Sequence, residues 1–166
     1  LAPERAVLIA IQAARALRSA HRAGVVHRDL KPSNVMLMKD DEVDFDADFV
    51  KVLDFGLVKV FEGGRDEADD DDVDLTRAGT MLGSPRYMAP EQIRCQSVDP
   101  RTDIYSLGVI LFHMLAGRPP FVGQGSVEIL NHHLRTPPPA IADVAPEAGC
   151  PQIGRASCRE RVFTVV

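Results

Sequence analysis

Cysteine is scarce in this sequence, and long apolar runs are missing. The 166 residues include only Cys95, Cys150 and Cys158, which are too few and too scattered for a disulfide framework or a zinc site and fit a reducing, cytoplasmic environment. No stretch reaches the roughly 18 consecutive apolar residues that a membrane helix needs, and no signal peptide opens the chain. Because the chain begins at Leu1 rather than at a methionine, we expect upstream sequence to be missing.

Basic residues are nearly absent from two acidic stretches. Residues 40–48 hold six acids and residues 62–74 hold eight, with Arg65 as the only base in either stretch. The rest of the chain is basic, although the net charge of the whole is -5. This distribution favours anionic ligands and argues against nucleic acid as the main partner. The acidic stretches themselves are expected to be solvated loops.

The composition is otherwise that of a single globular domain. The chain is 45% hydrophobic and 26% charged, which excludes a disordered chain. Residues 152–166 show no apolar periodicity and read like the translation of a sequencing adapter. We therefore expect a domain at residues 1–151 followed by a non-native tail, with a genuine basic tail as the alternative.

Three segments show helical periodicity. The first begins at Pro3 and is ended by Gly24, and the second, residues 103–115, is apolar over most of its circumference and should be largely buried. The third spans residues 126–134, with Ser126 as its N-cap. The expected inward face of the first helix comprises Val7, Ile11, Ala14, Leu17 and His21.

Short strands and a long loop complete the expected elements. Residues 35–38 and 50–53 predict two strands, joined by the first acidic stretch. Residues 54–91 show little periodicity and much Gly, Asp and Thr. They predict a long loop, and a loop of that length is usually functional or disordered.

Four polar motifs follow one another along the chain. They are His27-Arg28-Asp29-Leu30-Lys31-Pro32-Ser33-Asn34, Asp54-Phe55-Gly56, Gly83-Ser84-Pro85-Arg86-Tyr87-Met88-Ala89-Pro90-Glu91, and Asp103-Ile104-Tyr105-Ser106-Leu107-Gly108. In this order they resemble the catalytic loop, the metal-binding segment, the substrate-side segment and the following central helix of serine/threonine protein kinases of bacterial type. The resemblance implies an α+β, protein-kinase-like fold, here a mainly helical C-terminal lobe with a short β-hairpin. The N-terminal lobe would be absent, because its motifs lie upstream of Leu1.

The resemblance also implies transfer of the γ-phosphate of ATP to Ser and Thr hydroxyls of protein substrates. This reaction depends on positioning and charge neutralisation. Asp29 would orient the attacking hydroxyl, and Lys31 would balance charge on the transferred phosphoryl group. Asn34 and Asp54 would offer oxygen ligands to Mg²⁺, and Met36 would lie beneath the adenine ring. An Asp or Asn in a turn can instead serve only to cap backbone groups.

Scaffold positions are implied in the same way. His27 and Phe55 resemble the hydrophobic stack that links the two kinase lobes, anchored by the Asp103 side chain. The same residues could equally be simple core packing. Ser84 matches the hydroxyl that contacts Asp29 and Lys31 in this class of kinases.

Regulation is implied by Arg28, since an arginine beside the catalytic aspartate marks kinases that are switched by loop phosphorylation. A phosphate on Thr80, or on the second candidate Thr76, would pair with Arg28. Either threonine could also be an ordinary loop hydroxyl. The arginine that pairs with Glu91 in the family should lie beyond the end of the native sequence.

Two other functions remain possible from the sequence. A pseudokinase that binds partners without catalysis usually lacks one of the four polar residues assigned to catalysis and metal binding, all of which are present here. A small-molecule kinase of related fold would lack the segment that ends at Glu91. The fragment alone is expected to be inactive, and its oligomeric state, its physiological substrate and any further domains are left open.

Overall fold

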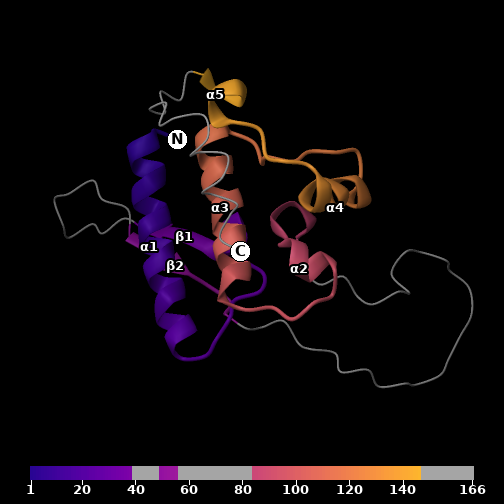
Figure 1. The fold of residues 1–166 in the computed structure, drawn as a ribbon. Helices are drawn as coiled ribbons and strands as arrows, with labels where there is room; N and C mark the ends of the chain where they lie inside the picture. Colours follow the sequence, from indigo (N-terminus) through magenta and orange to yellow (C-terminus); the bar gives the residue numbers. More distant parts are fainter. Residues whose placement is uncertain (39–48, 56–83, 147–166) are drawn as a thin grey trace, which may run out of the picture.

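The computed structural model describes residues 1–38, 49–55 and 84–146. Both acidic stretches, Thr76, Thr80 and residues 152–166 lie outside the described residues, and so do Cys150 and Cys158. The described part is mainly helical, and its sheet consists of two strands (Figure 1). This agrees with the α+β class expected from the sequence. No helix of the described part is both long and apolar enough to cross a bilayer.

Helix α1, Pro3–Arg22, begins and ends as predicted, and the predicted inward face is confirmed only in its second half, where Leu17 is buried, Ala14 packs against the core and His21 contacts Asp103. Proline occupies its first turn, Glu4 lies near its positive end, and Gly24 follows the helix with a φ of 76°. The predicted inward residues Val7 and Ile11 are exposed, and the buried side chains of the helix are Ala6, Ile9, Ala10, Ala13 and Leu17. Periodicity could not choose the buried face in the first half of the helix, because residues 6–11 are all apolar.

Helix α3, Pro100–Ala116, packs beside α1 through the centre of the molecule (Figure 1). Its N-cap is Asp99, whose carboxylate accepts a hydrogen bond from the Arg101 amide at 2.7 Å. Gly117 ends it in the left-handed conformation, with a φ of 72°. The predicted burial is confirmed, because Thr102, Asp103, Leu107, Val109, Ile110 and Phe112 are all buried.

Strands β1, Val35–Met38, and β2, Phe49–Val52, pair in antiparallel fashion, with Val35 opposite Val52. The first strand is as predicted, and the second begins and ends one residue earlier than predicted. In β2 the side chains alternate, so that Val50 and Val52 turn into the core against α1. The Gln12 amide oxygen on α1 accepts a hydrogen bond from the Val50 amide at 3.1 Å.

Shorter elements surround this core. They are the single-turn 3₁₀ helices η1, Pro32–Asn34, and η2, Pro85–Tyr87, and the α-helices α2, Pro90–Ile93, α4, Ser126–Arg135, and α5, Ile141–Val144. The predicted N-cap of α4 was wrong, because Gly125 occupies that position and Ser126 is the first helical residue. The Glu128 carboxylate accepts a hydrogen bond from the Gln124 amide at 2.8 Å instead.

Candidate active site

The buried carboxylate of Asp103 holds the segment at residues 27 and 28. Its two oxygens accept hydrogen bonds from the amides of His27, at 2.8 Å, and Arg28, at 2.9 Å. The His21 ring nitrogen Nε2 lies 2.7 Å from the same carboxylate. The side chain of Asp103 is 1% exposed, so these three groups replace the water that a buried charge would otherwise require. This contact fixes the start of the catalytic-loop motif against the central helix.

The same contact stabilises an unusual backbone conformation. Arg28 has a φ of 68°, in the left-handed region that L-residues with a Cβ rarely adopt. With this turn, the two consecutive amides of His27 and Arg28 both point at the Asp103 carboxylate. The Arg28 carbonyl oxygen also accepts a hydrogen bond from the Gln92 side chain at 2.6 Å. Helices α2 and α3 therefore both position this residue.

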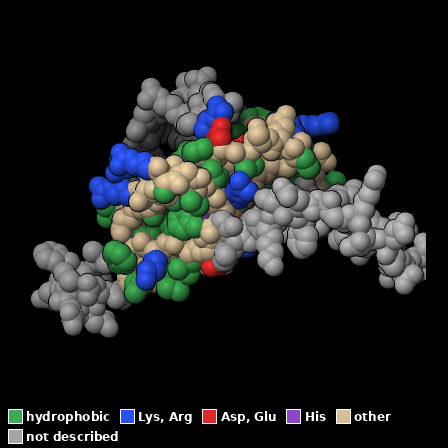
Figure 2. All heavy atoms as spheres, turned by 90° about the horizontal axis from the view of Figure 1, so that it is seen from below, with side chains coloured by type: hydrophobic (Ala, Val, Ile, Leu, Met, Phe, Trp, Pro, Cys, Tyr) green, Lys and Arg blue, Asp and Glu red, His purple; other side chains and the backbone are tan. Residues whose placement is uncertain are grey.

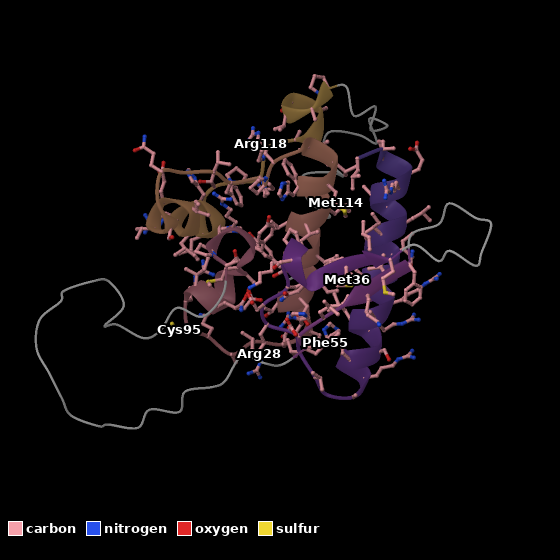
Figure 3. All side chains as sticks on the ribbon, turned by 180° about the vertical axis from the view of Figure 1, so that it is seen from behind. Arg28, Met36, Phe55, Cys95, Met114 and Arg118 are labelled. Atoms are coloured by element: carbon pink, nitrogen blue, oxygen red, sulfur yellow. The ribbon has the colours of Figure 1, made fainter. Side chains whose placement is uncertain are left out.

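His27 joins the loop to the segment at residues 53–55. Its Nε2 lies 2.7 Å from the Leu53 carbonyl oxygen, and the centroids of the His27 and Phe55 rings are 4.9 Å apart. His27 is fully buried. Figure 3 shows Phe55 and Arg28 near the same end of the molecule, away from Met114 on α3. The expected pairing of His27 with Phe55 and its anchoring through Asp103 are both present.

Three of the predicted polar residues contact one another directly. The Lys31 ammonium group donates to the Asp29 carboxylate at 2.6 Å, and the Asn34 amide nitrogen donates to the Asp29 carbonyl oxygen at 2.9 Å. Asp29 and Lys31 retain 22% and 32% of their side-chain exposure, so both can reach a ligand. Asn34 is buried, and its amide oxygen remains as an acceptor.

Asp54 is held next to this group by a backbone hydrogen bond of the residue that precedes it. The Leu53 amide donates to the Asn34 carbonyl oxygen at 2.9 Å, which places Asp54 one residue beyond the contact. Asp54 has a φ of 60° and an exposed side chain. A carboxylate and an amide oxygen are the hard ligands that suit Mg²⁺. No group of three or more His, Cys, Asp or Glu side chains that could hold a metal occurs among the described residues.

Two other predicted positions, Met36 and Ser84, make no hydrogen bond to Asp29, Lys31 or Asn34 among the described residues. Met36 lies on β1 with 47% of its surface exposed, so it is open to a planar ligand (Figure 3). Ser84 lines a small cavity together with Arg28, Asp29, Tyr87 and Gln92. Among the described residues the Ser84 hydroxyl makes no hydrogen bond to Asp29 or Lys31, and Lys31 contacts Asp29 directly.

Glu91 has a partner that sequence reasoning missed. Its carboxylate accepts a hydrogen bond from the Thr102 hydroxyl at 2.6 Å. Helix α2 is thereby tied to the first turn of α3. His21 and Gln92 were also missed. No local pattern distinguishes such residues from ordinary polar positions, because each acts on a partner far away in sequence.

Two tyrosine–histidine pairs support the substrate side of the site. The Tyr87 hydroxyl lies 2.9 Å from His113 Nδ1, and the Tyr105 hydroxyl lies 2.8 Å from His133 Nδ1. Burial lowers the pKa of His133 to about 4 and raises the pKa of Tyr105. His133 Nε2 makes no hydrogen bond of ordinary geometry. The nearby Arg86 backbone raises the His133 pKa, but by less than burial lowers it. His133 is therefore neutral at pH 7.

The fold and the site define the chain as a protein kinase domain. Residues 1–152 match the family described as protein kinase domain, so the chain belongs to that family. It is similar to serine/threonine-protein kinase pkn3 of Myxococcus xanthus, with 43% identity over 144 residues, 87% of this chain and 25% of that protein. It is also similar to serine/threonine-protein kinase PknB of Mycolicibacterium smegmatis, with 38% identity over 151 residues, 89% of this chain and 22% of that protein.

A third relative carries a more specific description. The DNA damage-responsive serine/threonine-protein kinase RqkA of Deinococcus radiodurans is 42% identical over 134 residues, which are 81% of this chain and 18% of that protein. The chain thus spans a quarter or less of the length of these three curated relatives.

Proposed function

We propose that this chain is the C-terminal lobe of a longer serine/threonine protein kinase that transfers the γ-phosphate of ATP to protein hydroxyls. The observation that carries the proposal is the direct contact of Asp29 with both Lys31 and Asn34, beside the backbone that presents Asp54. Charge and oxygen ligands are thus concentrated where a phosphoryl group and its metal need them. The serine/threonine kinase relatives support the same reaction.

The residues of the site would divide the work. Asp29 would accept a hydrogen bond from the attacking hydroxyl, and its 2.6 Å contact with Lys31 keeps both groups at the position of the reacting oxygen. Mg²⁺, when bound with ATP, would neutralise charge on the phosphates, and the oxygens of Asn34 and Asp54 would hold it. Met36 would pack beneath the adenine. The lobe that covers ATP from the other side would be supplied by the longer protein.

Substitution of Asp29 tests the catalytic assignment. In the longer kinase, Asp29→Asn should lower kcat by at least about a hundredfold with little change in KM for ATP, since the carboxylate acts on the hydroxyl in the transition state. Asp143→Asn, which alters an exposed carboxylate on α5, should leave kcat unchanged. Steady-state kinetics with a protein substrate would measure both, and an unchanged kcat in Asp29→Asn would end the assignment.

We also propose control by phosphorylation between residues 56 and 83, with Thr80 as the principal site and Thr76 as the second candidate. The support is Arg28, which lies half-buried beside Asp29 and makes no ion pair within the described part of the chain. A phosphate could satisfy its guanidinium group. Phosphopeptide mass spectrometry of active enzyme should find Thr80 modified, and Thr80→Ala should leave only low basal activity. An unmodified Thr80 in fully active enzyme would refute this assignment.

A further inference from the structure

One peptide group of the catalytic-loop motif, the group that joins Arg28 to Asp29, is held at both of its polar atoms. The Arg28 carbonyl oxygen accepts a hydrogen bond from Gln92 Nε2 at 2.6 Å. The Asp29 amide donates to His27 Nδ1 at 3.4 Å. The second distance lies beyond the usual range of about 2.7–3.2 Å. The Gln92 contact is therefore the stronger constraint on the tilt of this peptide group.

The Gln92 side chain is itself fixed at both ends of its amide group. Its Oε1 accepts a hydrogen bond from the backbone amide of Ala89, the N-cap of α2, at 3.1 Å. The oxygen thus pairs one of the amides that find no partner inside the helix, and the nitrogen faces the Arg28 carbonyl. A neutral amide offers an acceptor to one of these groups and a donor to the other, which neither an ionised carboxylate nor a thioether does.

Helix α2 gives the contact a fixed base. The Glu91 carboxylate ties this helix to the Thr102 hydroxyl on α3 at 2.6 Å. The amide of Arg28 is held from α3, through Asp103, and its carbonyl is held from α2. Together these contacts maintain the φ of 68° at Arg28. Loss of the carbonyl contact removes one of the restraints on a strained conformation.

The tilt of this peptide group determines where the Asp29 side chain points. The flanking rotations, ψ of Arg28 and φ of Asp29, are the soft degrees of freedom of the backbone there. Gln92 and Asp29 line the same small cavity, so Gln92 acts at short range. A displacement of about 1 Å of a reacting group is enough to lower a rate about a hundredfold.

We propose that Gln92 is a positioning residue for Asp29: by holding the Arg28 carbonyl, it keeps the Asp29 carboxylate directed at the hydroxyl that attacks the phosphoryl group. Gln92 acts through the backbone and does not need to touch ATP or the protein substrate. This inference rests on the proposed kinase function and deepens it, because it adds a residue of α2 to the groups that orient the nucleophile. It predicts a loss of kcat rather than of substrate binding.

The test removes the two hydrogen bonds of Gln92 in different combinations, in the longer kinase. Gln92→Met keeps the length of the side chain and removes both bonds. Gln92→Glu keeps an acceptor for the Ala89 amide but turns an oxygen that cannot donate towards the Arg28 carbonyl. Both variants should lower kcat about ten- to a hundredfold, while the KM values for ATP and for a protein substrate change less than about twofold. If Gln92 only capped α2, Gln92→Glu would match the wild type.

A matched control accounts for the added charge. On the face drawn in Figure 2, Lys and Arg side chains are more prominent than Asp and Glu among the described residues. A new carboxylate on the surface also weakens the attraction of anionic substrates. Gln96→Glu makes the same chemical change at an exposed residue just after α2, and it should leave kcat unchanged. Mass spectrometry and circular dichroism would confirm that all variants carry equal phosphorylation and are folded.

A double substitution supplies a readout that a merely structural role would not move. In the Asp29→Asn background, Gln92→Met should lower the remaining kcat by less than about twofold, because no carboxylate is left to be directed. Steady-state kinetics of the wild type, the two single variants and the double variant would measure this dependence.

The outcomes separate the role of Gln92 from the proposed function. A wild-type kcat in Gln92→Glu, or an equal loss from Gln92→Met with and without the Asp29 substitution, would overturn the role of Gln92 and leave the kinase function in place. A wild-type kinase that phosphorylates no protein substrate would overturn the proposed function, and the role of Gln92 with it.

Discussion

At the scale of single residues, Asp103 joins the catalytic-loop motif to the central helix and to His21 on α1. Its carboxylate lies on the central helix α3, yet it determines the backbone of His27 and Arg28. The strained φ of 68° at Arg28 persists because both amides gain a charged acceptor there. Loss of either oxygen should therefore release the loop.

Asp103→Asn is expected to destabilise the chain strongly. An amide nitrogen would then face one of the two backbone amides, so a charged hydrogen bond is lost and a buried donor is left unpaired, at a cost of about 2–4 kcal/mol. Urea denaturation of the purified chain would measure the free energy of unfolding. Asp143→Asn, at an exposed position, should change it by no more than about 0.5 kcal/mol. Equal stabilities for the two variants would contradict the anchoring role.

His133 should make the stability depend on pH. Its pKa is about 4 in the folded chain and 6.5 ordinarily, so below pH 6.5 the unfolded state takes up a proton that the folded state does not. The neutral His133 ring therefore contributes to the free energy of unfolding above pH 6.5. This contribution is lost as the pH falls towards 4, by about 3 kcal/mol in total. In urea unfolding, His133→Gln should make the free energy of unfolding depend less on pH between pH 7 and pH 4. An identical profile for the variant would show that His133 is not the titrating group.

At the scale of elements, glycine and proline set the helix ends. Helix α3 ends at Gly117, where a φ of 72° is open to glycine without strain. An added Cβ would meet nothing within 4 Å. Any cost of a larger residue at this position therefore comes from the backbone conformation alone, and not from a clash with a neighbour.

Gly117→Ala should accordingly lower the free energy of unfolding by about 1–2 kcal/mol. Gly117→Asn should lower it less, because asparagine tolerates the left-handed conformation better than alanine. Thermal unfolding of the three chains by circular dichroism would give the order glycine, asparagine, alanine. An alanine variant as stable as the wild type would mean that α3 ends differently in solution.

At the scale of the whole molecule, the apolar surface around the candidate nucleotide site is open. Met36, Leu37, Met38 and Phe49 are each at least 39% exposed on the two strands. The chain also spans a quarter or less of the length of the three relatives named above. If the chain is the C-terminal lobe proposed above, the surface beneath the adenine lacks its cover, and aggregation is a hazard.

The isolated chain should therefore bind ATP weakly and transfer no phosphate. Only one carboxylate and one amide would hold Mg²⁺, and no glycine-rich cover would surround the phosphates. Isothermal titration of the purified chain with ATP and Mg²⁺, together with a phosphotransfer assay, would measure both properties. Micromolar affinity, or turnover that Asp54→Ala abolishes, would show that this chain suffices alone.

Local signals in the sequence determined much of this protein. Pro3, Gly24 and Gly117 marked helix ends correctly, and the second strand was placed within one residue, although α3 begins at Pro100, three residues before its predicted start. These features depend on the φ preferences and side-chain spacing of a few adjacent residues, so the sequence contains them directly. The motif order indicated the kinase family that the comparisons show. The catalytic, metal-binding and regulatory roles remain predictions.

Only the tertiary structure decided which distant groups meet. Asp103 binds the amide of His27 across 76 positions, and Gln92 binds the Arg28 carbonyl across 64. Packing also decided which apolar residues of α1 face the core in its first half, where Ile9 is buried and Val7 and Ile11 are exposed. Burial makes each polar group take whatever partner the fold brings near it. That choice depends on how helices and loops are placed in space, which no local pattern of residues encodes.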